Sequence, residues 1–284
     1  MGLPQNVRYV SFHFAAAFSK RNSGEKYMKT KKFELLPPGE LLKEIRGTST
    51  VFVPIGSMEW HGPHMGMGMD TCNAYHVSLA TAERTGGIVF PPLFIGTETR
   101  RSPETLKKLG FTGEEDIVGM DFPANSLKSM YWPPQLFEQL IGWQIEALCC
   151  MGFRKIIIMN GHGADEQIRI LDTLSRKFSQ KYQISVRAIM VLADNCGYGL
   201  GHAGLAETAI MTRIYPEAVD LSKLPPKTEK ISVTEYGIAD SVTFEQGPTE
   251  DFSVRYDPRD ATSEIGEELL EAAVEKCVKI VEQS

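Results

Sequence analysis

The stretch STVFVPIGSMEWHGPH, residues 49–64, joins an uninterrupted apolar run to a cluster of ionisable side chains. Residues 49–56 are rich in β-branched and aromatic side chains, which predicts a strand buried on both faces. The ionisable groups follow directly, and they are Glu59, His61, His64 and, after a glycine-rich segment, Asp70. Groups that bind protons or metals, placed on glycine-rich backbone at the end of a strand, indicate a site rather than an ordinary surface loop.

The rest of the chain alternates strand-like with helix-like patterns. Further strands are predicted at 86–93, 154–160 and 185–194, and helices at 71–84, 135–151, 165–182 and 263–282. Gly152 is placed to end the second of these helices. Strands that alternate with helices pair in parallel, and the helices then cover both faces of the sheet. The predicted fold class is therefore α/β, with a mostly parallel central sheet.

Composition restricts the classes of function that remain. The chain has 284 residues, of which 42% are hydrophobic and 23% charged, as in an ordinary soluble globular protein. Its net charge of −6 provides no basic surface for nucleic acid or for anionic lipid, so we expect neither partner. No stretch approaches the roughly 20 apolar residues that a bilayer crossing needs. Five cysteines without CxxC spacing favour a reducing compartment, and we expect the cytoplasm.

The N-terminal residues do not resemble the core of the chain. Residues 1–21 make a poor signal peptide, because the charged region is weak and no small-residue cleavage site follows. The segment MKTKKFELLPPGELLKEI, from Met28, has the pattern of a domain start. We therefore predict an N-terminal extension, residues 1–32, and one domain, residues 33–284. Whether residues 1–27 belong to the native protein stays open.

Three of the predicted strands end in polar clusters. These clusters are GSMEWHGPH, NGHGAD and DNCGYGLGHAGLAET, and together they hold four of the six histidines, at positions 61, 64, 162 and 202. In parallel sheets, sites form where loops leave the carboxyl ends of strands. Residues 97–134 show no sustained period, which predicts a long excursion over the same end of the sheet, as a lid or an oligomer contact.

The residue types in these clusters suit divalent metals. Zinc and manganese are bound by neutral imidazole and by carboxylate, and a bridging carboxylate can hold two ions. Glu59 and His61 lie two residues apart on extended backbone, so their side chains point the same way. On their own they could equally well hydrogen-bond loop amides. The histidine of NGHG and the polar HAGLAE segment, at two further strand ends, favour a metal site.

Four motifs resemble those of a known family. PIGSMEWHGPHMGMGMD, GFRKIIIMNGHGAD, GHAGLAET and YDPRDATSEIGEELLE are similar, in order and character, to the motifs of the creatininase (creatinine amidohydrolase) family. The resemblance runs from about residue 33 to the C-terminus. It implies a three-layer α/β/α sandwich, a two-metal centre and hydrolysis of a C–N bond in a cyclic amide or formamide. It also implies a small-molecule substrate and a homo-oligomer, often a hexamer.

The resemblance also implies a ligand set. Glu59, Asp70 and His162 would hold one ion, while His61, Asp70 and a further carboxylate would hold the other, with Asp70 bridging. In creatininase itself that carboxylate stands where this chain has Ala164. We take Glu207 as the ligand and keep Asp165 as the alternative. Zinc is the favoured metal, with manganese or iron(II) as alternatives.

The expected chemistry follows from the implied metals. Two ions sharing a water lower its pKa and give a metal-activated hydroxide, which attacks a polarised carbonyl carbon. By resemblance His202 is the acid that protonates the leaving nitrogen, and Glu207 counts as catalytic through its ligand role. The alternative for His202 is a residue that orients the site or caps a helix. His64 is expected to orient Glu59 or its loop.

The substrate is the least defined part of the prediction. The chain has no tryptophan after Trp143, whereas creatininase closes tryptophans over a flat ring, so creatinine is a poor candidate. Arg100 and Arg101 in the long excursion favour an anionic or polyhydroxylated ring compound. Two alternatives remain open. One is hydrolysis of a cyclic ketone or lactone derived from a sugar or polyol, and the other is a non-catalytic metal-binding subunit.

Overall fold

A parallel β-sheet forms the centre of the computed structural model, which describes residues 30–192, 197–199, 201–248 and 256–283. The order of its main strands is β2-β1-β4-β5. Their bounds are β1 Thr50–Gly56, β2 Ile88–Val89, β4 Lys155–Asn160 and β5 Ser185–Met190, and a further short strand, β3 Leu93–Phe94, also pairs with β1. Every pairing in this sheet is parallel.

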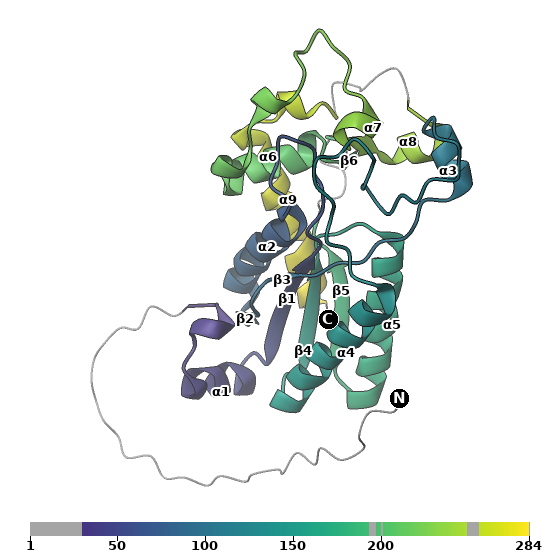
Figure 1. Cartoon of the computed structure of the whole chain (residues 1–284). Helices are drawn as coiled ribbons and strands as arrows, with labels where there is room; N and C mark the ends of the chain where they lie inside the picture. The colour runs from purple at the N-terminus through teal and green to yellow at the C-terminus, as the bar shows by residue number, and fades with distance from the viewer. Residues whose placement is uncertain (1–29, 193–196, 200, 249–255, 284) are drawn as a thin grey trace, which may run out of the picture.

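Helices cover both faces of the sheet, as Figure 1 shows. One face carries α1 Pro38–Arg46, α4 Pro134–Met151 and α5 Asp165–Tyr182. The other carries α2 Met69–Thr85 and α9 Ser263–Glu282, and α6 Leu205–Ile214 packs on these two helices. Alternate strand residues supply the two cores, since Val51 and Val53 pack on the α4 side while Phe52 packs on the α2 side. The predicted three-layer α/β/α sandwich is confirmed.

One predicted strand was wrong in its extent. The segment 86–93 forms two short strands, β2 and β3, in place of one. Pro91 and Pro92 lie between them, and proline has no N–H for the strand ladder. The other expected elements are present within a few residues of their predicted ends. Residues 193 and 194, at the end of the last predicted strand, lie outside the described residues.

A small cap lies beyond the carboxyl ends of the strands, above the sheet in Figure 1. Residues 97–134 contribute α3 Pro103–Lys108, and a later segment contributes α7 Val233–Tyr236, β7 Ala239–Asp240 and α8 Ser241–Gln246. β7 pairs antiparallel with β6 Gly201–His202. The two segments share a separate apolar cluster, whose buried residues are Leu106, Leu109, Ile117, Met120, Phe122, Val233 and Ala239. The long excursion therefore covers the sheet end, as predicted.

Short 3-10 turns complete the described chain at Phe33–Leu35, Pro216–Ala218, Leu221–Lys223 and Pro258–Asp260.

The backbone just before residue 33 already contacts the sheet. The Val89 amide donates to the Lys31 carbonyl oxygen over 2.7 Å, and Lys32 forms a bridge to Val89. The division between residues 32 and 33 stays a prediction, and residues 1–29 lie outside the described part. Among the described helices, none has both the length and the apolar character that a bilayer crossing demands.

Gly161 provides a test of how tightly the sheet end is packed. A Cβ atom there would lie 2.0 Å from the backbone oxygen of Asp70, whereas a Cβ at Gly163 would meet nothing within 4 Å. Overpacking typically costs about 1–3 kcal/mol. We expect Gly161→Ala to lower the free energy of unfolding by at least that much in urea denaturation. The matched control, Gly163→Ala, should change it by less than about 0.5 kcal/mol. Equal effects of the two changes would contradict this packing.

Candidate metal centre

Five ionisable side chains converge at the carboxyl end of the sheet. They come from four places: the loop after β1, the loop after β4, and the first turns of two helices, α2 and α6. The residues are Glu59 and His61, His162, and then Asp70 on α2 and Glu207 on α6. All five are buried, with at most 8% of each residue exposed. Charged residues are rarely buried unless they are paired or bind a metal, so this burial itself indicates a site.

The five residues form two triads that share Asp70. In the first triad, His162 Nδ1 lies 3.1 Å from Glu59 Oε2 and 3.0 Å from Asp70 Oδ2. In the second, His61 Nε2 lies 3.2 Å from Asp70 Oδ1 and 3.6 Å from Glu207 Oε2. Each triad brings its ligand atoms within 4.8 Å of one another. Asp70 thus directs one oxygen to each triad, which is the geometry of a bridging carboxylate.

The donor atoms fit a divalent cation. His61 Nδ1 lies 3.0 Å from the Glu59 carbonyl oxygen, which can only accept, so the neutral ring carries its proton on Nδ1. The Nε2 lone pair then faces carboxylate oxygens, and Nε2 has no hydrogen-bond partner within the described chain. Two atoms bound tetrahedrally to one zinc ion lie about 3.4 Å apart. The observed N···O separations of 3.0–3.6 Å agree with that value.

Electrostatics holds protons on the imidazoles. Burial disfavours the charge on Glu59, but the neighbouring His162 and His202 outweigh it and lower the pKa of Glu59 to about 2. Burial likewise opposes a charge on His61, yet Asp70 and Glu207 raise its pKa to about 10. Burial raises the pKa of Glu207 to about 7, although His61 opposes this. The cluster therefore attracts positive charge, and a divalent ion would replace the imidazole protons.

The two candidates for the fifth ligand lie in different surroundings. Glu207 is buried, belongs to the second triad, and accepts a 2.6 Å hydrogen bond from the Ala203 amide. Asp165 is exposed at the first position of α5 and belongs to neither triad, although it lines the same cavity. Ala164, the residue just before α5, carries no ligand atom.

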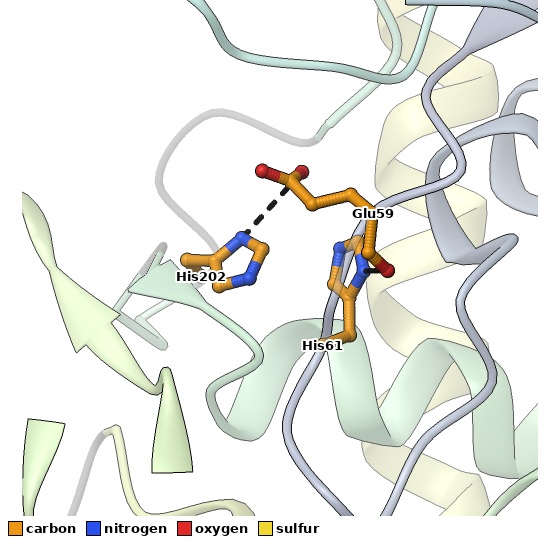
Figure 2. A group of neighbouring side chains, drawn as sticks. All are labelled: Glu59, His61 and His202. Carbon is orange, nitrogen blue, oxygen red and sulfur yellow. Dashed lines mark hydrogen bonds and ion pairs between the residues drawn. The ribbon is translucent and has the colours of Figure 1, made fainter. Parts of the chain in front are cut away.

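His202 lies beside the first triad on β6. Its Nε2 is 2.6 Å from the Trp60 carbonyl oxygen and must donate to it, so Nδ1 of the neutral ring carries the lone pair. That Nδ1 lies 3.8 Å from Glu59 Oε2. Figure 2 shows both contacts of Glu59, its carboxylate facing His202 and its carbonyl oxygen facing His61. Burial, opposed by Glu59 and assisted by His61, lowers the pKa of His202 to about 4. In this state His202 accepts a proton rather than supplying one.

Two residues that contact the triads, Ser57 and Tyr131, were not predicted from the sequence. Ser57 Oγ lies 2.7 Å from Asp70 Oδ2 and 3.2 Å from His162 Nδ1. The Tyr131 hydroxyl donates to Glu59 Oε1 and accepts from the Met120 amide over 3.1 Å. Ser57 stands two residues before Glu59, so the spacing that selected Glu59 and His61 could have found it. Tyr131 lies in the long excursion, where no periodic pattern points to it.

His64 and Trp60 contact segments that lie far from the β1 loop in the sequence. His64 Nε2 lies 3.0 Å from Thr208 Oγ1, next to Glu207, so His64 contacts α6 rather than Glu59. Trp60 Nε1 donates to the Tyr236 carbonyl oxygen in the cap over 2.9 Å. Both side chains therefore connect the β1 loop to the later segments that surround the site.

A network of amides fixes the loop that carries His162. Asn160 Nδ2 donates to the His162 carbonyl oxygen over 2.8 Å, and the His162 amide donates back to Asn160 Oδ1 over 3.2 Å. Gln167 Nε2 donates to the same Oδ1, and Gln167 Oε1 accepts from the Thr97 amide over 2.9 Å. The asparagine of the NGHG motif therefore closes the turn, and Gln167 ties it to the start of the cap.

A cavity of about 460 Å³ opens over the triads. Its lining on the sheet side includes Glu59, Asp70, His162 and Glu207. On the cap side it includes Arg101 and Phe244. The Arg101 guanidinium lies 4.4 Å from the Phe244 ring centre, and its Nε donates to the Gly119 carbonyl oxygen over 2.9 Å. Arg100 does not line the cavity and pairs with Asp116 on the surface.

Comparison with known proteins identifies one family. The sequence pattern of the family described as creatinine amidohydrolase matches residues 38–281. The creatinine amidohydrolase of Pseudomonas putida is 24% identical over 203 residues, which cover 64% of this chain and 72% of that protein. Two solved structures, a mutant creatininase of the "Zn-Zn type" and "Creatininase Mn", are 21% and 22% identical. Each has a TM-score of 0.63, and each match covers 90% of this chain and 98% of the other.

The solved structures establish the likeness of the fold, and the family pattern covers most of the sequence. Both triads and His202 lie inside the matched residues 38–281. This chain therefore belongs to the creatininase (creatinine amidohydrolase) family, whose members are hydrolases of C–N bonds other than peptide bonds.

Proposed function

We propose that this chain is a dinuclear metal-dependent hydrolase that cleaves a C–N bond in a cyclic amide or formamide. The observation that carries the proposal is the position of Asp70, which directs one carboxylate oxygen to each buried triad. Glu59 and His162 complete one ion site, and His61 and Glu207 complete the other. Zinc is the favoured ion, with manganese or iron(II) as alternatives, since histidine and carboxylate ligands suit all three.

The residues around the ions have separate tasks. Two bound ions would supply Lewis acidity, lowering the pKa of a water molecule and polarising the substrate carbonyl group. His202, held by its Nε2–H bond to Trp60, offers Nδ1 to take the proton that the attacking water loses. Glu59 Oε2, 3.8 Å away, stabilises the imidazolium that results. His202 then returns that proton to the nitrogen as the C–N bond breaks, so one proton passes from water to the amine.

The cavity restricts the substrate to a small polar ring. Its volume of about 460 Å³ lies in the lower part of the range for small-molecule sites. Arg101 offers charged hydrogen-bond donors from the cap, and Glu98, Asp240 and Glu245 add acceptors along the same wall. Because Glu98 lies 3.5 Å from the Arg101 guanidinium and partly neutralises it, the wall suits a polyhydroxylated or amide-rich ring better than a polyanion.

A substrate screen tests the reaction class directly. The metal-loaded enzyme is incubated with lactams, hydantoins and formamides in one panel, and with lactones and cyclic ketones in another. Release of an amine from the first panel supports the proposal. Turnover confined to the second panel would establish the alternative, hydrolysis of a sugar- or polyol-derived ring, and would overturn the C–N assignment.

Metal content distinguishes the two candidates for the fifth ligand. Glu207→Gln removes a charged oxygen from the second triad, so we expect its bound metal to fall from two equivalents per chain toward one. Asp165→Asn changes an exposed carboxylate in the same cavity and should retain both equivalents. Elemental analysis of protein purified without chelator measures both. The opposite pattern would assign the ligand to Asp165, and Asp70→Asn with full metal content would disprove the bridge.

The role of His202 can be separated from metal binding. A group that transfers protons contributes typically about 10²–10⁴ to the rate. We expect His202→Asn to lower kcat by that order while both metal equivalents remain. A substrate with a good leaving group should suffer less, because its departure needs little protonation. Loss of one metal equivalent would show instead that His202 maintains the site, and equal slowing of good and poor leaving groups with both equivalents retained would rule out its role as the acid.

The two adjacent arginines form a matched pair for testing substrate contact. We expect Arg101→Ala to raise KM about tenfold or more, since hydrogen bonds to a charged group are worth about 1.5–3 kcal/mol. Arg100→Ala removes the same charge outside the cavity and should leave KM unchanged. Steady-state kinetics on the best substrate of the screen measures both. Equal KM values for the two variants would remove Arg101 from the binding site.

A further inference from the structure

Tyr131 contacts the metal centre from outside the cavity. Its hydroxyl donates to Glu59 Oε1, and its ring centre lies 6.2 Å from the ring centre of His162. Both of these partners belong to the first triad. Tyr131 does not line the cavity over the triads, and its hydroxyl proton already binds Glu59. Tyr131 is therefore placed to act on a metal ligand rather than on the substrate.

The two carboxylate oxygens of Glu59 have different partners. Oε1 accepts from Tyr131, whereas Oε2 lies 3.1 Å from His162 Nδ1 in the first triad. Carboxylates that bind metals are themselves oriented by hydrogen bonds from neighbouring groups. Because the hydroxyl engages Oε1, the carboxylate presents Oε2 to the triad. Tyr131 thus sets both the direction of Glu59 and the number of oxygens that it offers.

Neighbouring backbone fixes Tyr131 in this place. The Met130 amide donates to the Met58 carbonyl oxygen over 2.7 Å, which holds the segment of Tyr131 against the loop of Glu59. The hydroxyl oxygen accepts from the Met120 amide over 3.1 Å. A hydroxyl that accepts from this amide can direct its single proton to the carboxylate.

One peptide group joins Tyr131 to the arginine of the cap. Arg101 Nε donates to the Gly119 carbonyl oxygen over 2.9 Å, and the N–H of the same peptide group is the Met120 amide that donates to Tyr131. Hydrogen bonds in such a chain polarise one another, and a charged donor makes the stronger bond. Three hydrogen bonds therefore form a continuous path from Arg101 to Glu59.

Glycine at position 119 makes this path possible. Gly119 has a φ of 53°, in the left-handed region that favours glycine. A Cβ atom there would overlap the Tyr131 hydroxyl oxygen and would lie 2.6 Å from Glu98 Cγ. Gly110 also has a positive φ, 89°, but a Cβ atom there would meet nothing within 4 Å. Position 119 thus needs glycine for space beside the hydroxyl as well as for its backbone conformation.

We propose that Tyr131 is a positioning residue that couples Arg101 in the cap to the first metal site. It restricts Glu59 to binding through Oε2, and Arg101 fixes the peptide group that orients the Tyr131 hydroxyl. A substrate that binds Arg101 would then alter the hydrogen bonds behind a metal ligand without touching that ligand. The inference rests on the proposed dinuclear centre, but metal affinity can be measured without any turnover.

Metal affinity tests the role of Tyr131. Titration of Zn²⁺ in competition with a chromophoric chelator gives a dissociation constant for each ion. We expect Tyr131→Phe to raise the constant of one ion about 10- to 100-fold, the usual cost of losing a group that orients a ligand, and to spare the other. The control Tyr182→Phe removes a hydroxyl that donates to Glu146 at the far end of α5, and it should change neither. Unchanged constants, or equal losses at both ions, would overturn the proposal.

The cobalt form reports the binding mode of Glu59. Co²⁺ absorbs visible light more weakly as its coordination number rises. If Tyr131→Phe frees Glu59 to bind through both oxygens, the absorbance of one site should fall even when both sites are full. A wild-type spectrum from the fully loaded variant would show that Glu59 needs no hydroxyl to direct it, and would overturn the proposal.

A second variant disturbs the same hydrogen bond without changing Tyr131. Gly119→Ala places a methyl group against the hydroxyl oxygen, so we expect it to weaken the same ion as Tyr131→Phe. Gly110→Ala carries a comparable backbone strain without that clash and should leave both dissociation constants unchanged. Equal effects of the two glycine variants would contradict the proposal.

A double-mutant cycle tests the coupling to Arg101. A through-space effect of the Arg101 charge on the ion would be the same with or without the Tyr131 hydroxyl, whereas an effect along the path requires it. We therefore expect the factor by which Arg101→Met changes the constant of that ion to differ at least about threefold between the wild-type and Tyr131→Phe backgrounds. Arg100→Met, which removes a surface charge paired with Asp116, should give one factor in both.

The outcomes separate this inference from the proposed function. Equal factors for Arg101→Met in a chain that binds two ions would overturn the coupling and leave the dinuclear centre intact. A wild-type chain that binds fewer than two ions would overturn the dinuclear centre, and this inference with it.

Discussion

The close approach of helix α2 to the ends of two adjacent strands is the constraint on which the site depends. A Cβ atom at Gly56 would lie 2.5 Å from the Asp70 Cβ, and one at Gly161 would lie 2.0 Å from the Asp70 backbone oxygen. Both strand ends therefore need glycine at the point of contact. Only with this approach does the Asp70 carboxylate reach between the imidazoles of His61 and His162, whose loops leave β1 and β4. Gly56 and Gly161 thus both leave the space that Asp70 occupies between the two strand ends.

Burial gives the cluster its affinity for cations, at a cost to the metal-free protein. Three carboxylates and two imidazoles are nearly excluded from water, and removing charged groups from water is unfavourable unless other charges compensate. In the metal-free cluster, Asp70 keeps the pKa of His61 well above its usual value, so protons provide the compensation. Divalent ions would provide more of it. We therefore interpret metal binding here as part of the stability of the folded chain as well as of its chemistry.

The sequence predicted those parts of the molecule that depend on local pattern. The strand at Thr50–Gly56 and the helices after it follow from apolar runs and periodicity, and Glu59 and His61 follow from their position at a strand end. Contacts between distant segments could not be predicted in this way. Tyr131 reaches Glu59 across 72 positions, and His64 reaches Thr208 across 144. The apolar residues on each side of Pro91 and Pro92 predict one strand, but the two prolines lack the N–H groups that a continuous ladder needs.

The start of α4 and the metal centre are connected through one short segment. Tyr131, whose hydroxyl binds Glu59, precedes the first residue of α4 by three positions. Trp132, between them, donates its amide to the Gly96 carbonyl oxygen and accepts a 2.7 Å hydrogen bond from the Thr97 hydroxyl. Thr97 in turn donates its amide to Gln167, which holds the loop of His162. The backbone just before α4 therefore belongs to the same hydrogen-bonded network that holds the loop of His162 in the first triad.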